Sequence, residues 1–395
     1  MKRTPRVAST ITFLGLLLVL SSVSALAATH YYVVANNNTP TNTVSVFQVS
    51  GSSLVPVTTV PTGGSGSGGG YFAEAMQSIA QDGSNTCIFA GDANSGDIAA
   101  MKIISTSPYL SVVGNYVSPD GDSATNDGLG ITVSGGYLYA NYTGGTTSPA
   151  IGVWKIGAGC TLTFVTHLLT KGLNGGPIDG MAATPNGKFL VVGYGDGSVG
   201  SYAIGAGSIS LIGQELTFAA EASPGGVAIS ANGRWAIFGD FSPSNNTELD
   251  VASIGANGAL APTTTYGGAG SLGGIDSNGI QLSPDNRFIY VVDSYYGQET
   301  TVSFDSTTGV ITYPNSCLTS LKEYDLNWVF ASQPAVVANS GAGGGLYISE
   351  GFGNGDSYIA LLKINSTTGC ATEAPNSPFV DTNSGTLESI TSYVH

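Results

Sequence analysis

Positive charge is the scarcest property of this chain. Only 11 of its 395 residues are Lys or Arg, against 26 Asp and Glu, and charged residues of both signs make up 9% of the sequence. A polyanion is bound by clustered cations, so this composition excludes nucleic acid and anionic membrane surfaces as partners. It also disfavours a phosphorylated substrate, because proteins usually hold phosphate with a clamp of Arg and Lys.

Histidine and cysteine are almost as rare, with 3 and 4 residues. No two cysteines lie close together, so no zinc-site spacing is visible. His30 and His395 lie at the ends of the expected exported chain and His167 lies in an expected outer strand, which favours structural roles for all three. The chain also lacks the Gly-x-Ser-x-Gly nucleophile motif and the Gly-x-x-x-x-Gly-Lys phosphate loop.

Long apolar runs are absent except at the start of the chain. There, three basic residues precede the apolar segment 11–20, which is too short to span a bilayer comfortably, and Ala25-Leu26-Ala27 has the small residues of a cleavage site. We expect residues 1–28 to be a signal peptide. The remainder, 29–395, is expected to be periplasmic or extracellular, without a membrane anchor, and to carry a formal charge of −18, since 8 Lys and Arg then face the 26 acids.

A unit that recurs seven times dominates the rest of the sequence. Each unit has a short apolar run, a tight turn such as Asn186-Gly187, and a second run rich in Val, Ile, Tyr and Phe. Such turns favour β-hairpins. The second runs begin about 46 to 58 residues apart, near Tyr31, Cys87, Tyr137, Phe189, Trp235, Phe288 and Leu346. This period is typical of propeller blades, so the sequence predicts an all-β, seven-bladed β-propeller with four-stranded blades over 29–395.

The two chain ends predict how the ring closes. The segment 30–34 resembles a second strand with no first strand before it, while 387–394 is a first strand with no second strand after it. An open ring would expose two sheet edges. We therefore expect the C-terminal strand to join the N-terminal blade.

The four cysteines, all in the part expected to be exported, predict two disulfides. Of the three possible pairings we favour Cys87 with Cys160 and Cys317 with Cys370, because each pair falls in neighbouring blades. The ring also predicts one apolar layer at each boundary between blades, which avoids the size limit of a single core.

The acids fall mainly on one face of the predicted ring. In a propeller the loops from strand four to the next strand one, and from strand two to strand three, open on the same face. The first kind of loop, with the start of strand one, contains Glu74, Asp127, Asp179, Glu221, Asp276 and Glu388, and the ends of second strands contain Asp92, Asp196, Asp240, Asp293 and Glu350. The opposite face receives Lys188, Arg234 and Arg287. This pattern predicts a negative funnel around the channel.

This funnel is the predicted site. The candidates for ligand binding are Glu74, Gln77, Asp127, Asp179, Glu221, Asp276, Asn278 and Glu388. Within this set, Asp179, Glu221 and Asp276 are expected to hold a hard cation such as Ca²⁺, which prefers oxygen ligands. Crowded carboxylates also favour one carboxyl that stays protonated near neutrality. The alternative is that these acids only keep the protein soluble and cap turns.

The segments 176–192 and 280–292 resemble blades of the seven-bladed lactonase family, which includes 6-phosphogluconolactonase-like proteins and carboxymuconate cyclases. The resemblance implies a funnel site of His, Arg and Glu, with Arg-His after a Gly-Pro at an inner strand. Here Gly176-Pro177 is followed by Ile178-Asp179, so the catalytic pattern is not matched.

Three functions remain open. The first is an exported propeller whose funnel binds a small neutral or cationic ligand, or a protein. The second is a lactone hydrolase that uses an acid-bound metal as Lewis acid. The third is a self-assembling surface protein, although we expect a monomer.

Overall fold

The architecture comes from a computed structural model of the 395-residue chain. It describes residues 30–67, 77–123, 129–145, 149–213, 215–218, 223–241, 248–267, 279–293, 298–313, 317–321, 329–331, 335–337, 345–352, 357–381 and 389–395. Within these ranges no helix is both long and apolar enough to cross a membrane. The expected signal peptide, 1–28, lies outside the described residues.

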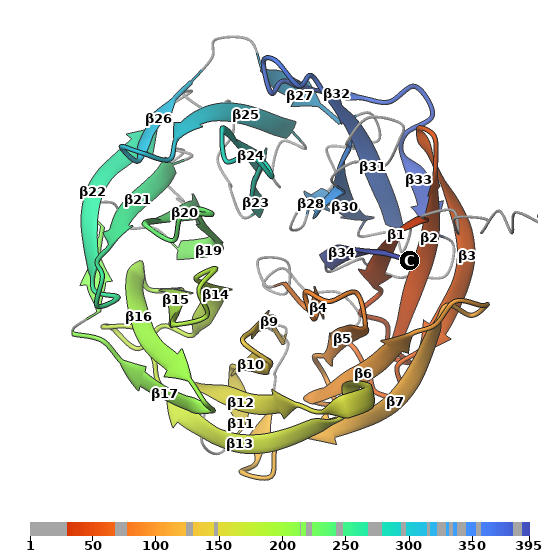
Figure 1. The fold of residues 1–395 in the computed structure, drawn as a ribbon, viewed down its shortest axis with the longest axis horizontal. Helices are drawn as coiled ribbons and strands as arrows, with labels where there is room; N and C mark the ends of the chain where they lie inside the picture. Colours follow the sequence, from red (N-terminus) through yellow and green to blue (C-terminus); the bar gives the residue numbers. More distant parts are fainter. Residues whose placement is uncertain are drawn as a thin grey trace, which may run out of the picture.

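Seven antiparallel sheets surround a central axis (Figure 1), as the sevenfold repeat predicts. In each sheet the first strand lies nearest the axis and the following strands lie progressively further out. The second strands begin where the sequence predicts, for example at Cys87, Tyr137 and Phe189. The seven-bladed β-propeller is therefore confirmed.

Blades 1 to 4, each counted from the axis outward, are formed by the following strands. Blade 1 contains β34 (Ser389–Val394), β1 (Tyr31–Asn36), β2 (Thr43–Ser50) and β3 (Ser53–Pro61). Blade 2 contains β4 (Ile79–Gln81), β5 (Cys87–Asp92), β6 (Asp97–Ile103) and β7 (Leu110–Val117). Blade 3 contains β9 (Ile131–Ser134), β10 (Tyr137–Tyr142), β12 (Ala150–Ile156) and β13 (Leu162–Leu169). Blade 4 contains β14 (Ile178–Ala183), β15 (Phe189–Tyr194), β16 (Ser198–Gly205), β17 (Ser208–Leu211) and β18 (Leu216–Thr217).

Blades 5 to 7 follow the same plan. Blade 5 contains β19 (Ser223–Ile229), β20 (Trp235–Phe241), β21 (Glu248–Ile254) and β22 (Leu260–Gly267). Blade 6 contains β23 (Gly279–Leu282), β24 (Phe288–Asp293), β25 (Gln298–Asp305), β26 (Val310–Thr312) and β27 (Leu318–Ser320). Blade 7 contains β28 (Val329–Ala331), β29 (Ala335–Val337), β30 (Gly345–Phe352), β31 (Ser357–Ile364), β32 (Ala371–Glu373) and β33 (Phe379–Asp381). A short sheet of β8 (Asp122–Ser123) and β11 (Gly144–Gly145), and the 3-10 helix η1 (Ala158–Cys160), lie outside the blades.

Turn chemistry explains the hairpin between the first two strands of blade 3. Gly135 and Gly136 have φ of 59° and 81°, and Ser134 pairs directly with Tyr137. Positive φ at both central residues defines the type I′ turn, whose twist matches that of the flanking strands. Glycine adopts this conformation without a steric penalty.

The C-terminal strand closes the ring as expected. β34 pairs antiparallel with β1 from Tyr31↔Val394 to Asn36↔Ser389. The backbones of His30 and His395 add two reciprocal hydrogen bonds of 2.8 and 2.9 Å. Blade 1 is thus built from both ends of the described chain, so neither end of the ring leaves an open inner edge.

The core is divided among the blade boundaries. Among the described residues, seven apolar clusters form, and each combines residues of two adjacent blades. Between blades 2 and 3, for example, Phe89 of β5 packs in one cluster with Leu138 and Trp154 of blade 3. This arrangement lets a long chain bury its apolar residues without one thick core.

Both disulfides join neighbouring blades, and the favoured pairing is confirmed. Cys87 of β5 is bonded to Cys160 of η1, with their Cα atoms 5.6 Å apart. Cys317, next to β27, is bonded to Cys370, next to β32, with a Cα separation of 4.9 Å. They cross-link blade 2 to blade 3 and blade 6 to blade 7.

Candidate functional site

Two of the eight predicted funnel residues, Gln77 and Asp179, belong to the described part of the chain. The other six lie outside the described residues: Glu74, Asp127, Glu221, Asp276, Asn278 and Glu388. The predicted cation site therefore keeps one described member, Asp179, and the funnel as a whole stays a prediction.

The inner ends of blades 2, 3 and 4 meet at a polar cluster around Gln77 and Asn141. The backbone N–H of Ile131 donates to the carbonyl of Gln77 at 2.8 Å. Asn141, which is buried, accepts a hydrogen bond from the Gly130 N–H at 2.7 Å and donates to the Ile178 carbonyl at 3.1 Å. The Asn141 amide therefore ties blade 3 to blade 4 beside the channel.

A small cavity lies within this cluster. It measures about 10 Å³ and is lined by Gln77, Gly130, Ile131, Asn141, Gly180 and Met181. That volume is about what one water molecule needs. The cavity itself is therefore too small for an organic ligand, which would have to bind above it, at the exposed side chain of Gln77.

Asp179 is displaced from the regular ladder of β14. The pairing of β14 with β15 shifts register between Ile178 and Gly180, so Asp179 lies in a β-bulge, a feature that re-aims side chains near functional sites. Its half-buried carboxylate lies against the backbone of Gly195, where an added Cβ would come within 2.9 Å of Oδ2. A larger residue at 195 would push the Asp179 carboxylate away.

A second polar cluster, the Asp92 network, crosses the boundary between blades 1 and 2. The Asp92 side chain is 0% exposed. Its Oδ1 accepts hydrogen bonds from Asn42 Nδ2 at 2.6 Å and from Thr62 Oγ1 at 2.8 Å. Asn42 also donates to Asn36 Oδ1 at 2.8 Å, so the network extends back to the second strand of blade 1.

The other oxygen of Asp92, Oδ2, has no hydrogen-bond partner. The nearby acid is Asp97, also buried, which accepts a hydrogen bond from Asn115 Nδ2 at 2.5 Å. Burial, reinforced by the negative charge of Asp97, raises the pKa of Asp92 to about 7 against the opposing hydrogen bonds from Asn42 and Thr62. Near neutrality Asp92 is therefore partly protonated, and the proton gives the two carboxyls a hydrogen bond they otherwise lack.

Asp196 lies at the same end of the second strand in blade 4, in the turn two residues after β15 ends. Its Oδ2 accepts from the backbone N–H groups of Asn174 and Gly176 at 2.7 and 3.0 Å, and its Oδ1 accepts from Ser198 N and Oγ at 3.1 and 2.5 Å. Partial burial acts to raise the pKa of Asp196, but the hydrogen bonds outweigh it and the pKa is lowered. Asp196 is a charged loop anchor.

Sequence reasoning missed several buried acids, among them Glu299 in β25. Glu299 is 0% exposed, and Thr301 Oγ1 donates to its Oε1 at 2.8 Å. Burial raises the pKa of Glu299 to about 8 although this hydrogen bond lowers it. Strand alternation was the one available signal: it places Glu299 and Thr301 on the same face of β25, although it does not tell whether that face is buried.

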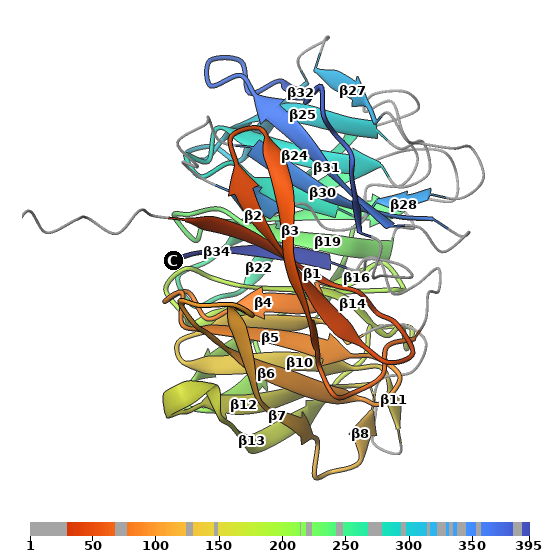
Figure 2. The same ribbon diagram turned by 90° about the vertical axis from the view of Figure 1, so that its right-hand side faces the viewer.

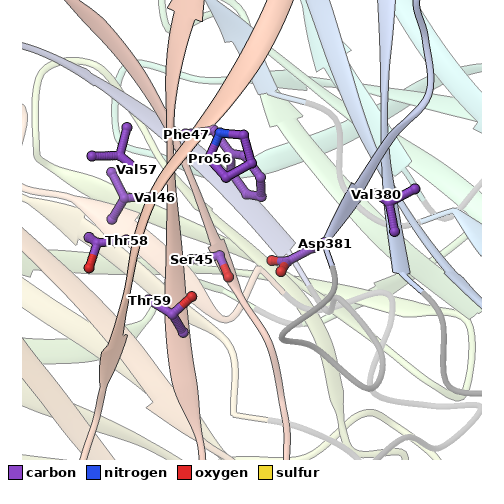
Figure 3. Close-up of a pocket in the computed structure, with 9 residues that line it drawn as sticks. All are labelled: Ser45, Val46, Phe47, Pro56, Val57, Thr58, Thr59, Val380 and Asp381. Carbon is purple, nitrogen blue, oxygen red and sulfur yellow. The ribbon is translucent and has the colours of Figure 1, made fainter.

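A larger hollow than the one at Gln77 lies away from the channel, on the rim between blades 1 and 7 (Figure 3). It has a volume of about 380 Å³ and is lined by Ser45, Val46, Phe47, Pro56, Val57, Thr58, Thr59, Val380 and Asp381. These residues come from β2, β3 and β33. The size suits a small molecule, but no signal in the sequence predicts this groove.

The basic residues Lys188, Arg234 and Arg287 lie in the turns between first and second strands, as predicted. Arg287 Nε donates to Asp285 Oδ2 at 2.7 Å, and both side chains are about half exposed. These turns open on the face opposite to Asp92 and Asp196, at the side of the ring where the C-terminus lies (Figure 2).

Comparison with known proteins places the chain by its fold. No protein-family model and no curated protein sequence matches it. A putative 6-phosphogluconolactonase from Bacteroides fragilis aligns with a TM-score of 0.67 and 14% identity, over 93% of this chain and 98% of that chain. The periplasmic gluconolactonase of Pseudomonas aeruginosa gives 0.64 and 15%, over 92% and 99%.

A putative 6-phosphogluconolactonase from Bacteroides uniformis also aligns, with a TM-score of 0.56 and 15% identity, over 72% of this chain and 81% of that chain. At these identities the likeness concerns the fold. The chain shares its seven-bladed propeller fold with these proteins, and the resemblance of its blade motifs to that family is confirmed at the level of the fold.

Proposed function

We propose that this protein is an exported lactonase-like propeller that binds a small neutral or cationic ligand at the acidic face of its channel. The observation that carries the proposal is the polar cluster of Gln77 and Asn141, whose amide donates to the Ile178 carbonyl, next in sequence to the bulged Asp179. An exposed amide, a bulged strand and a half-buried carboxylate supply both hydrogen-bond donors and an acceptor.

Charge selects the class of ligand. A formal charge of −15 for the whole chain, with 11 Lys and Arg, repels anions. A polyol, a neutral lactone, an amine or a hard cation such as Ca²⁺ is compatible with it. For Ca²⁺, we propose Asp179 with Glu221 and Asp276 as the carboxylate ligands.

Export is part of the proposal. It is supported by two disulfides, which persist in oxidising compartments, and by the fold shared with a periplasmic gluconolactonase. We propose further that the protein acts as a monomer and reaches its ligand in the periplasm or outside the cell. Size-exclusion chromatography at high concentration tests this against a self-assembling surface protein.

The binding test is calorimetric titration with Ca²⁺, a neutral sugar lactone and an amino sugar. We expect at least one of them to bind, and Asp179→Asn to weaken that binding about tenfold. Asp305→Asn is the matched control, because Asp305 is exposed and ends β25 at the turn to β26, on the opposite face. Absence of binding by all three ligands, or equal losses in both variants, would overturn the proposal.

A second candidate is metal-assisted lactone hydrolysis. It is supported by the fold that the chain shares, over nearly its whole length, with a putative 6-phosphogluconolactonase and a periplasmic gluconolactonase. The metal would act as Lewis acid on the lactone carbonyl, and an uncharged sugar lactone suits the acidic face better than a phosphorylated one. A pH-stat assay on sugar and aliphatic lactones, with and without chelator, tests this second candidate. Turnover that is abolished by chelator and by Asp179→Asn supports hydrolysis. Absence of turnover on all of these lactones counts against hydrolysis.

A further inference from the structure

A mixed nitrogen and oxygen cluster, the Asp120–Asp122–His167 cluster, lies at the outer strand of blade 3. One ligand atom from each of the three side chains lies within 4.8 Å of the other two. Asp120 and Asp122 belong to the connection that follows β7, and His167 belongs to the outer strand β13. The cluster therefore joins the link between blades 2 and 3 to the rim of blade 3.

Regular structure holds two of the three side chains in place. Asp122 begins β8, whose partner β11 pairs Gly145 with Asp122, and Figure 2 shows this small sheet on the side of the ring away from the C-terminus. His167 pairs with Gly152 within the blade. Groups fixed by strands hold a ligand geometry better than groups on loops.

The distances fit a tetrahedral ion. His167 Nδ1 lies 2.9 Å from Asp122 Oδ2 and 3.6 Å from Asp120 Oδ2. Zn²⁺ binds His nitrogen and carboxylate oxygen at about 2.0–2.2 Å, so neighbouring ligands of a tetrahedral zinc lie about 3.4 Å apart. The two separations lie on either side of that value, and movements of about half an ångström would centre an ion.

A supporting hydrogen bond orients the buried ligand. Ser118 Oγ donates to Asp122 Oδ2 at 2.7 Å, and the Asp122 side chain is 0% exposed while that of Asp120 is 43% exposed. Such outer contacts position ligands and raise metal affinity. The exposed Asp120 leaves a path by which an ion and a water ligand can enter.

We propose that Asp120, Asp122 and His167 form a Zn²⁺ site that fastens the connection between blades 2 and 3 to strand β13. The carboxylate of Asp122 accepts the Nδ1–H of His167 at 2.9 and 3.1 Å in the metal-free protein. Zn²⁺ would take the place of that proton on Nδ1, the neutral imidazole would carry its proton on Nε2 instead after exchange with solvent, and water would fill the fourth position.

Imidazole is what distinguishes this site from the proposed Ca²⁺ site. Ca²⁺ takes six to eight oxygen ligands, whereas one imidazole with two carboxylates suits Zn²⁺ and its neighbours in the Irving–Williams order. An excess of Ca²⁺ is therefore not expected to displace Zn²⁺. The inference does not depend on the proposed function, so Asp179→Asn should leave Zn²⁺ binding unchanged.

The test is calorimetric titration of the tag-free protein with ZnCl₂. We expect one Zn²⁺ per chain, about 100-fold weaker binding in His167→Ala, and about tenfold weaker binding in Asp120→Asn and in Ser118→Ala. His30→Ala is the matched histidine control and should bind as the wild type does. Asp120 is exposed, so its substitution reports on the ion without disturbing the fold, which circular dichroism verifies.

Two further measurements guard the result. Co²⁺ bound in place of Zn²⁺ should give the strong visible absorption of a tetrahedral centre, and His167→Ala should lose it. Saturating Zn²⁺ should raise the melting temperature of the wild type more than that of Asp120→Asn. The proposal is overturned if the wild type does not bind Zn²⁺ at millimolar concentration, if His167→Ala and Asp120→Asn bind like the wild type, or if His30→Ala removes the binding.

Discussion

Asp92 and Asp196 lie at the same end of the second strand in two blades, and yet their chemistry is opposite. Asp92 is the last residue of β5, whereas Asp196 lies in the turn two residues after β15 ends. Asp92 has a carboxylate neighbour, two side-chain donors and no exposure, so its pKa rises to about 7. Asp196 has backbone N–H groups and a serine that donate to it, so its pKa falls. The same end of a second strand thus carries a carboxyl that holds a proton in blade 2 and a carboxylate that stays charged in blade 4.

The reason lies in what the neighbouring loop offers. Around Asp196 the Asn174 and Gly176 backbones approach closely, and an added Cβ at Gly176 would lie 2.5 Å from the Asp196 backbone nitrogen. The backbone of Gly64 also lies close to Asp92, but the groups that donate to Asp92 are the side chains of Asn42 and Thr62. Unpaired N–H groups favour a charge, whereas a second buried carboxyl opposes it.

The largest expected effect is the loss of stability when the Asp196 carboxylate is removed. Asp196→Ala leaves the N–H groups of Asn174 and Gly176 without their acceptor, and we expect a loss of about 3 kcal/mol in the free energy of unfolding at pH 7. Urea denaturation measures it. A loss below about 1 kcal/mol would show that water replaces the carboxylate at no cost.

The next effect concerns the pH profile of the wild-type protein. Because the pKa values of Asp92 and Glu299 are raised in the folded state to about 7 and 8, the folded protein binds more protons than the unfolded chain between about pH 4 and pH 8. Stability should therefore rise as the pH falls from 8 to 5, because the folded state takes up these two protons and the unfolded chain does not. Below about pH 4 it should fall again, as Asp196 and Asp285, whose pKa values are lowered, become protonated.

Two variants test whether Asp92 and Glu299 cause this pH dependence of stability. Asp92→Asn and Glu299→Gln should each flatten the profile between pH 8 and pH 5, and together they should remove it. Asp305→Asn, on the exposed opposite face, is the control and should keep the wild-type slope. Denaturant midpoints measured at half-unit pH steps provide the comparison, and a wild-type midpoint that falls steadily from pH 7 to 5 would contradict our assignment.

The smallest effect extends the comparison to the opposite face. The Arg287–Asp285 pair is about half exposed, and partial burial opposes the hydrogen bonds from Ser283 and Arg287 that lower the pKa of Asp285. Exposed ion pairs contribute about 0–1 kcal/mol. Asp285→Asn should therefore cost less than about 1 kcal/mol, and the cost should shrink in 1 M salt; thermal melts at two salt concentrations measure it.

Some structural features were visible in the sequence because their causes are local. The Gly135-Gly136 turn required positive φ at both positions, which only glycine adopts freely, so that hairpin was readable directly. The pairing of Cys87 with Cys160 followed once the blades were counted. The buried state of Glu299 was not readable, because alternation gives the face of a strand and not what covers it.

The sequence by itself determined the sevenfold repeat, the closure of blade 1 by β34, the joining of neighbouring blades by both disulfides, and the excess of acid. Periodicity and turn chemistry depend on residues that are close together in the chain, so they can be recognised in the sequence alone. Only the tertiary structure decided which acids hold protons, that a groove lies between blades 1 and 7, and that His167 meets Asp122 across 45 residues. Those properties depend on desolvation and on contacts between distant segments, and the order of residues alone does not give either.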